Sequence, residues 1–271
     1  MCMGVLYLYN SWSKTVIETT LDRERWYKEI ALVTGASSGI GMAIAKKLST
    51  LGMKVILMAR RETKLQHLAG EINSQGGSAA IYPTDLRNTQ LLERRFDEIK
   101  DHHGPIRLMV NNAGLGHYAP LISGETEYWR NMLEVNVLAT CVCTRESVRH
   151  MRQHGDWGQV VHISSMSAHR VPEGSGVYSA TKFAIRSLTE SLRKELRDLE
   201  SSIRIASISP GFVETEFAAH YHRSEEKAEQ LYKQYPVLQP DDIAQSLLYI
   251  LSQPQHVEVH DLLLRPTQQT N

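Results

Sequence analysis

The sequence is poor in cysteine, in long apolar runs and in net charge. Three cysteines among 271 residues cannot form a disulfide framework, so we expect a reducing, cytoplasmic compartment. No apolar run approaches the roughly 18 residues that a membrane span needs. Lys plus Arg and Asp plus Glu both number 30, which gives no reason to expect nucleic acid or an anionic membrane as a partner. Cys141 and Cys143 lie in a helical pattern with too few ligands nearby, so no metal site is predicted.

Residues 1–28 carry little pattern. The first 21 residues have no basic start, and Asn10 interrupts their apolar run early, so a secretory signal is not expected. We expect residues 1–28 to form a poorly ordered arm, although an alternative translation start is an equally open interpretation of the first 21 residues. Residues 29–271 are expected to form a single domain.

From residue 29 onward, short apolar runs alternate with amphipathic helical patterns. The runs begin with Ile30–Thr34 and end with Leu262–Leu264, and each is too short for a buried helix. Apolar strands separated by helices favour a parallel sheet covered on both faces. We therefore predict an α/β fold with a single doubly wound, Rossmann-type sheet, whose ligands lie at the carboxyl ends of the strands. Residues 212–238 are expected to form a lid over that edge.

A glycine-rich turn, TGASSGIG, occupies Thr34–Gly41, where the first strand meets the first helix. Glycines let the backbone turn tightly and approach a ligand, and the helix N-terminus offers unpaired N–H groups to a phosphate. In this context the turn predicts a dinucleotide site, although its spacing differs from the commoner GxGxxG. The residues assigned to the site are Gly35, Ser37, Ser38, Gly39, Ile40 and Gly41.

The end of the second strand indicates which dinucleotide is bound. Ala59 stands where NAD sites usually carry an acid for the ribose hydroxyl, and Arg60 and Arg61 follow it. Because guanidinium groups bind phosphate through paired hydrogen bonds, this pattern favours NADP(H). The alternative is a pair of solvated surface arginines. The turns after the third and fourth strands complete the predicted cofactor site with Asp85, Leu86, Asn112, Ala113 and Gly114.

Tyr178 and Lys182 are the candidate acid–base pair. Four residues apart on a helical pattern, they lie on one face. A free phenol has a pKa near ~10, and a neighbouring ammonium is expected to lower it. The tyrosine could then give a proton to a carbonyl oxygen or take one from an alcohol. Considered alone, the pair is more often a half-buried tyrosine beside a solvated lysine.

Two further polar residues accompany this pair. Ser165 follows the fifth strand and places a hydroxyl at the cofactor edge, whereas His162, within that strand, is expected to be packed rather than catalytic. Asn136 lies on the apolar stripe of a helix expected over 126–153. A buried amide without partners costs ~1–3 kcal/mol, so Asn136 is either a satisfied core residue or the support of a local helix kink.

Together these motifs resemble the short-chain dehydrogenase/reductase family. TGASSGIG, NNAG, Asn136, Ser165, Tyr178 with Lys182, and Pro210-Gly211 occur in the family's order and approximate spacing, over about 29–265. The resemblance implies that Tyr178 is the acid/base and that Ser165 orients the carbonyl. It also implies that Lys182 binds the nicotinamide ribose and that Asn136 holds a relay water. The further cofactor contacts that it implies are Pro210, Gly211, Val213 and Thr215.

The resemblance also frames the expected reaction. We expect an NADP(H)-dependent carbonyl reductase or alcohol dehydrogenase that assembles as a homodimer or homotetramer. Several stretches, including YSATK and ISPGFVET, resemble the insect farnesol dehydrogenases of that family. The aromatic lid favours a small apolar substrate: a ketosteroid, a prenyl alcohol such as farnesol, or a dicarbonyl. Ordinary packing is the other explanation for its residues Phe212, Phe217, Tyr221, Leu231, Tyr232 and Tyr235. A catalytically idle NADPH-binding sensor or scaffold is the alternative function.

Overall fold

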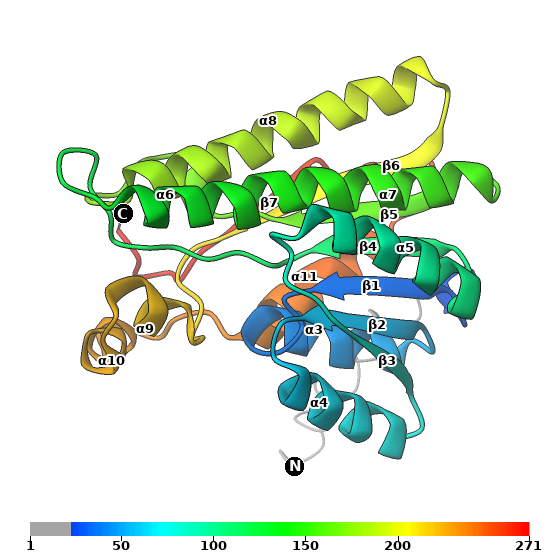
Figure 1. Ribbon diagram of the computed structural model, residues 1–271, viewed down its shortest axis with the longest axis horizontal. Helices are drawn as coiled ribbons and strands as arrows, with labels where there is room; N and C mark the ends of the chain where they lie inside the picture. Colours follow the sequence, from blue (N-terminus) through cyan, green and yellow to red (C-terminus); the bar gives the residue numbers. More distant parts are fainter. Residues whose placement is uncertain (1–22, 271) are drawn as a thin grey trace, which may run out of the picture.

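A seven-stranded sheet lies between two layers of helices in the computed structural model, which describes residues 23–270 (Figure 1). All neighbouring strands are parallel, in the order β3-β2-β1-β4-β5-β6-β7. The predicted α/β, doubly wound fold is confirmed. The strands are β1 (Ile30–Thr34), β2 (Lys54–Ala59), β3 (Ser78–Pro83), β4 (Ile106–Asn111), β5 (Trp157–Ile163), β6 (Ser202–Pro210) and β7 (Asp261–Leu264).

Helices connect the strands and cover both faces of the sheet. They are α2 (Arg23–Trp26), α3 (Gly39–Thr50), α4 (Glu62–Ser74), α5 (Thr89–His103), α6 (Thr126–Leu133), the π-helix η1 (Glu134–Leu138), α7 (Ala139–Gln153), the 3-10 turn η2 (Met166–Ala168), α8 (Gly176–Asp198), α9 (Phe217–His222), α10 (Glu225–Lys233) and α11 (Pro240–Ser252). Between Arg23 and Thr270, no helix is long and apolar enough to cross a membrane.

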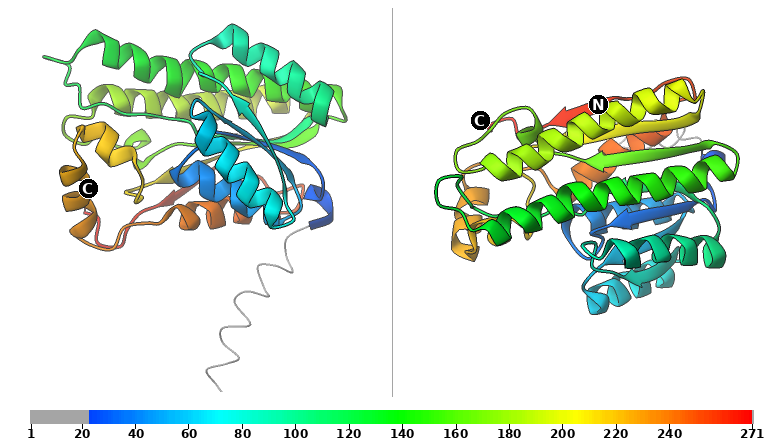
Figure 2. Two further views of the ribbon diagram at one scale, coloured as in Figure 1. Left: turned by 60° about the horizontal axis from the view of Figure 1, so that its bottom comes forward. Right: turned by 45° about the horizontal axis from the view of Figure 1, so that its top comes forward.

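The two faces of the sheet carry separate hydrophobic clusters. Helices α3, α4 and α11 pack on one face, and α5, α7 and α8 pack on the other (Figure 2). Along β1, Val33 belongs to the first cluster and Leu32 to the second, because successive strand residues point to opposite faces. Burial on both sides explains why the strands are almost continuously apolar.

The strand order reverses between β1 and β4, and this opens a crevice at the carboxyl ends of the strands. Helices α9 and α10 stand apart from the two layers, at this end of the sheet (Figure 1). They belong to the segment that was expected to form a lid.

The N-terminal boundary of the packed fold lies earlier than expected. Residues 1–22 of the anticipated arm are outside the described part of the chain. Trp26, however, is almost fully buried, its ring lies 5.9 Å from that of Trp157, and its indole nitrogen donates to the Leu251 carbonyl at 3.2 Å. Residues 23–28 are therefore part of the folded domain rather than of an arm.

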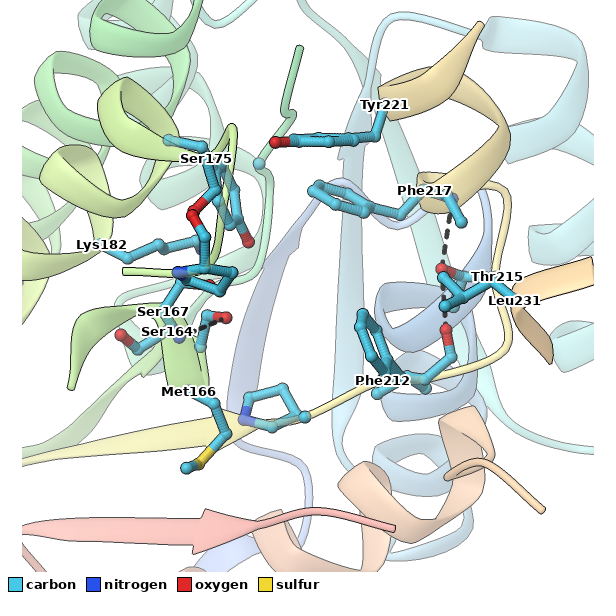
Figure 3. A pocket seen from close by; sticks show the side chains of 18 of the residues that line it. Ser164, Met166, Ser167, Ser175, Lys182, Phe212, Thr215, Phe217, Tyr221 and Leu231 are labelled. Carbon is cyan, nitrogen blue, oxygen red and sulfur yellow. Dashed lines mark hydrogen bonds between the residues drawn. The ribbon is translucent and has the colours of Figure 1, made fainter. Parts of the chain in front are cut away.

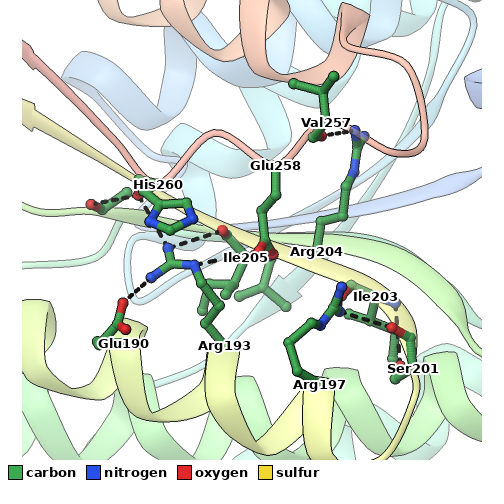
Figure 4. A network of polar contacts seen from close by, with 12 residues as sticks. Glu190, Arg193, Arg197, Ser201, Ile203, Arg204, Ile205, Val257, Glu258 and His260 are labelled. Carbon is green, nitrogen blue, oxygen red and sulfur yellow. Dashed lines mark hydrogen bonds and ion pairs between the residues drawn. The ribbon is translucent and has the colours of Figure 1, made fainter.

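Buried arginines fix the segment that leads from α11 to β7 (Figure 4). Arg204 on β6 donates to the carbonyl oxygens of Gln253, Pro254 and Val257. Glu258 accepts a hydrogen bond from the Ile205 backbone N–H at 3.0 Å. These contacts satisfy charges that would be costly to bury alone, and they hold the last strand in register.

His162 is a packed residue of β5, as the sequence predicted. Its two ring nitrogens contact the hydroxyl oxygens of Thr189 at 2.8 Å and Thr144 at 3.1 Å. Burial lowers the pKa of His162 to about 3, with a smaller contribution from the Lys182 charge. Because its pKa is about 6.5 in the unfolded chain, the unfolded state binds more protons between pH 6.5 and 3. His162 therefore reduces stability as the pH falls through this window.

We predict that His162→Gln changes the acid sensitivity of the fold. At neutral pH the variant should be less stable than the wild type, because the substitution disturbs the packing of the buried ring and its two hydrogen bonds to Thr189 and Thr144. Between pH 7 and 4.5 this difference should narrow by roughly 2 kcal/mol, since only the wild type carries the titrating imidazole. Urea unfolding of both proteins at pH 7 and at pH 4.5 measures this difference in the free energy of unfolding. Parallel losses of stability in the two proteins would contradict a neutral, buried His162.

Candidate active site

The turn after β1 and the turn after β4 are locked together. The Thr34 hydroxyl accepts hydrogen bonds from the backbone N–H groups of Asn112 and Ala113, both at 3.1 Å. The Asn112 side chain donates back to the Thr34 carbonyl at 2.8 Å. A Cβ at Gly35, where φ is +65°, would lie 2.9 Å from the Ala113 Cα. Only glycine fits this contact without a shift of the backbone.

A cavity of about 590 Å³ opens beside these turns. It is lined by most of the residues predicted to bind the cofactor: Gly35, Ser37, Ser38, Gly39, Ile40, Arg60, Arg61, Asp85, Leu86, Asn112, Ala113, Gly114 and Thr215. Helix α3 points its N-terminus at this cavity, and no side chain caps its first N–H groups. These donors, the absence of side chains at the glycines and the neighbouring arginines fit a dinucleotide phosphate.

Gly41, which was predicted to bind the cofactor, packs against the two turns. It does not line the cavity, and a Cβ there would lie 2.4 Å from the Asn112 side-chain nitrogen and 2.5 Å from the Gly35 carbonyl oxygen. The residue therefore lets α3 pack closely against the two turns, which shapes the cavity indirectly.

Arg61 reaches over the glycine turn. Its guanidinium donates to the Ser37 hydroxyl at 3.1 and 3.0 Å and to the Ser38 hydroxyl at 2.6 Å. Arg60 also lines the cavity, on the side of Asp85, whose pKa is lowered mainly by Arg87 and to a small extent by Arg60. Both arginines thus lie at the place predicted for the ribose end of the cofactor.

The candidate acid–base residues converge from β5 and α8. The Ser165 hydroxyl forms a hydrogen bond with the Tyr178 side chain and accepts another from the Ser167 backbone N–H at 3.0 Å. Lys182 is buried, and its ammonium donates to the Ile163 carbonyl at 3.0 Å. The ammonium nitrogen stands 5.8 Å from the centre of the Tyr178 ring.

The pKa expected for Tyr178 is not the one found. Burial raises the pKa of this phenol to about 12, which the hydrogen bond from Ser165 opposes only in part. Burial also lowers the pKa of Lys182 to about 8. Desolvation of the phenolate is thus the largest effect on the Tyr178 pKa, and the Ser165 hydrogen bond, rather than the Lys182 ammonium expected from the sequence, opposes it. At neutral pH, Tyr178 therefore carries its proton.

Asn136 lies at a local irregularity of the helix, which agrees with the prediction that it supports a helix kink. The π-helix η1 separates α6 from α7 and contains Asn136. The amide exchanges hydrogen bonds with the Leu115 backbone, at 2.9 and 2.8 Å, and donates to the Thr181 hydroxyl at 3.0 Å. A Cβ added at Gly114 would lie 3.6 Å from both the Asn136 oxygen and the Lys182 nitrogen. Asn136 is thus fully satisfied and close to the candidate acid–base pair.

A second cavity, of about 410 Å³, has Ser165, Tyr178 and Lys182 in its wall. Figure 3 shows Lys182 on one side and the lid residues Phe212, Phe217 and Tyr221 on the other. The Phe217 ring lies 5.4 Å from the Tyr178 ring. Leu231 and Tyr232 of the predicted lid also line this cavity, whereas Tyr235 does not. Pro210, Gly211 and Val213, which were predicted as cofactor contacts, line this second cavity and are not among the residues that line the first.

Several residues of the two cavities were not predicted. Met166, Arg170 and Gln269 line the second cavity, and Gln269 accepts a hydrogen bond from the Phe212 backbone N–H at 3.1 Å. Glu216 lines the first cavity and pairs with Arg61. In the sequence, Glu216 is only an acidic residue that follows Thr215 in the expected lid. That position does not reveal its partner Arg61, which lies 155 positions earlier.

Comparisons with known proteins agree with this geometry. The family profile described as short chain dehydrogenase matches residues 29–226. Dehydrogenase/reductase SDR family member 11 from Bos taurus is 44% identical over 252 residues, covering 91% of this chain and 99% of that protein. The human protein of the same name is also 44% identical, with 91% and 97% covered.

Solved structures of similar proteins share the fold over most of their length. The closed form of serine dehydrogenase complexed with NADP+ has a TM-score of 0.84 and 30% identity, covering 89% of this chain and 96% of its own. The alcohol dehydrogenase from the archaeon Thermococcus sibiricus, complexed with 5-hydroxy-NADP, has a TM-score of 0.79 and 28% identity, covering 90% and 98%. The protein described here is therefore a member of the short-chain dehydrogenase/reductase family, an oxidoreductase whose fold binds a nicotinamide cofactor.

Proposed function

We propose that the protein is an NADP(H)-dependent oxidoreductase that interconverts the carbonyl and alcohol forms of a small apolar substrate. The observation that carries this proposal is the meeting of the two cavities beside Tyr178. Ile40, Asn112, Gly114, Thr215 and Phe217 line both cavities. A cofactor in the first cavity and a substrate in the second would therefore meet next to a proton donor.

The nicotinamide, when bound, supplies or accepts the hydride. The chain's own residues manage the proton and the orientation of the substrate. Tyr178, which is protonated at neutral pH, is placed to donate to a carbonyl oxygen, and the Ser165 hydroxyl beside it is placed to orient that oxygen. Lys182 supplies a positive charge and a hydrogen-bond donor near the Tyr178 side chain. Asn136 holds the backbone of Leu115 through hydrogen bonds. These roles make Tyr178, Ser165 and Lys182 the proposed catalytic residues, with Asn136 in support.

The substrate class follows from the wall of the second cavity. Phe212, Phe217, Tyr221 and Leu231 present apolar surface across the cavity from Lys182 (Figure 3), and the Phe217 ring packs on that of Tyr178. Such a wall favours a ketosteroid, a prenyl alcohol such as farnesol, or a dicarbonyl over a charged small acid. Cytoplasmic location and assembly as a homodimer or homotetramer stay predictions from the sequence.

We predict that Tyr178→Phe abolishes most turnover but not cofactor binding. The substitution removes one hydroxyl and little volume, and proton transfer by a positioned side chain contributes ~10²–10⁴-fold to rate. Initial rates with NADPH and a panel of apolar ketones and dicarbonyls measure the loss, and NADPH titration measures binding. Tyr221→Phe, in the same cavity, is the matched control and should retain most activity. Substantial turnover by Tyr178→Phe would remove this residue from the acid/base role.

The same panel separates the proposed enzyme from the idle sensor. Turnover of at least one carbonyl by the wild type, lost in Tyr178→Phe, supports catalysis. Tight NADPH binding without turnover of any carbonyl or alcohol would favour the sensor.

We predict that the protein prefers NADPH to NADH by roughly ten- to several-hundred-fold in kcat/KM. Ala59 leaves the ribose position without a carboxylate, and Arg60 and Arg61 supply cations there. Arg61→Ala should lower kcat/KM with NADPH by about tenfold or more, with little effect on NADH. Arg60→Ala is the matched comparison, and the double change Ala59→Asp with Arg60→Ala should erode or reverse the preference. A wild type that prefers NADH would overturn this assignment.

A further inference from the structure

The cationic end of the cofactor cavity already holds an anion from the protein itself. One oxygen of the Glu216 carboxylate lies 2.8 Å from the Arg61 guanidinium, and the other lies 2.7 Å from the Lys64 ammonium. Arg61 is at the same time hydrogen-bonded to Ser37 and Ser38 of the glycine turn. A carboxylate from the lid therefore occupies Arg61, which lines the dinucleotide cavity, together with Lys64.

Glu216 keeps its charge under all ordinary conditions. Lys64 first, and then Arg61, lowers the pKa of its carboxyl group to about 2, despite some opposing desolvation. A carboxylate held between a guanidinium and an ammonium uses the same donors that a phosphate would use. Arg61 cannot give its full set of donors to both anions at once, so Glu216 and a bound phosphate compete.

The contact is weak enough to be exchanged. The side chains of Glu216, Arg61 and Lys64 are each about 40% exposed or more. Exposed ion pairs of this kind contribute little to stability because water and salt screen them. A phosphate with two negative charges can therefore displace the carboxylate without unfolding any part of the domain.

Glu216 is also joined to the catalytic face through its two neighbours in the chain. Thr215 lies over the glycine turn, where a Cβ at Gly39 would be 3.0 Å from its methyl group. The Thr215 hydroxyl accepts a hydrogen bond from the Phe217 backbone N–H at 3.2 Å (Figure 3). The Phe217 ring packs on both Tyr178 and Tyr221. Three consecutive residues thus connect the cation pair to the proposed proton donor.

We propose that Glu216 is a specificity-determining latch that occupies the 2′-phosphate position until a nucleotide carrying that phosphate displaces it from Arg61 and Lys64. The proposal rests on the proposed preference for NADP(H), which it extends to the lid. When the latch is displaced, the segment Thr215–Phe217 loses its ion pairs with Arg61 and Lys64. A nucleotide with a free 2′-hydroxyl leaves the latch in place.

The same contacts allow the opposite role, in which Glu216 holds Arg61 in position for the phosphate. The two roles differ in sign. Removing the charge of a competitor strengthens binding of a 2′-phosphorylated nucleotide, whereas removing the charge of a support weakens it. Competition is the better interpretation, because Ser37 and Ser38 already orient Arg61 through three hydrogen bonds.

Glu216→Gln tests the latch with nucleotides that need no turnover. Adenosine 2′,5′-bisphosphate carries the relevant phosphate, and adenosine 5′-monophosphate lacks it. Calorimetric titration of the full chain should show about three- to tenfold tighter binding of the bisphosphate to the variant, given the small energies of exposed ion pairs. Binding of the monophosphate should change by less than about twofold.

Glu214→Gln is the matched control. Glu214 is an exposed acid two residues earlier, and its carboxylate bonds to Gln239 rather than to a cation of the cavity. It changes the net charge equally, so a general electrostatic effect would appear in both variants. The latch is overturned if Glu216→Gln binds the bisphosphate with unchanged or weaker affinity, or if Glu214→Gln shows the same gain.

A second measurement reports on the lid. Adding the bisphosphate to the wild type should increase amide hydrogen exchange at residues 216–222, and the monophosphate should not. Increased protection of these amides by the bisphosphate would contradict release of the latch. If the protein reduces no carbonyl at all, the proposed function fails, whereas both nucleotide measurements still decide the role of Glu216.

Discussion

The hydrogen bond from the Lys182 ammonium to the Ile163 carbonyl holds the candidate acid–base residues together. It joins the helix that carries Tyr178 to the end of the strand that precedes Ser165. The ammonium is buried, so losing this acceptor would leave a charge without a protein partner, which costs far more than an ordinary hydrogen bond contributes. Asn136 adds a second connection, through Thr181, between α8 and the neighbouring π-helix.

Much of the fold could be predicted because its signals are local. Short apolar runs, the glycine turn and the spacing of Tyr178 and Lys182 each depend on neighbours within a few residues. The parallel sheet then brings every strand end to one edge, so residues assigned to separate turns, such as Ser37, Asp85 and Asn112, line one cavity.

The features that the sequence did not reveal depend on burial or on distant contacts. The pKa of Tyr178 follows from how completely the surrounding lid and helix remove water, which a spacing of four residues cannot show. Gly41 has the position of a phosphate-binding glycine in the glycine-rich turn, yet its close neighbour is the Asn112 side chain. Trp26 precedes the first strand without any periodic pattern, and only the position of Trp157 explains its burial.

The π-helix η1 constrains how this chain can change its length. An α-helix turns by about 100° per residue, and the wider turn at Glu134–Leu138 shifts everything before it relative to everything after it. Trp129, before the turn, donates to the Ala119 carbonyl, and Thr144, after it, accepts a hydrogen bond from the Asn111 side chain at the end of β4. Deleting one residue between these two contacts would rotate one of the two side chains by about 100° away from its partner. Related chains should therefore keep the residue count of this helix constant and vary in length at the surface loops instead.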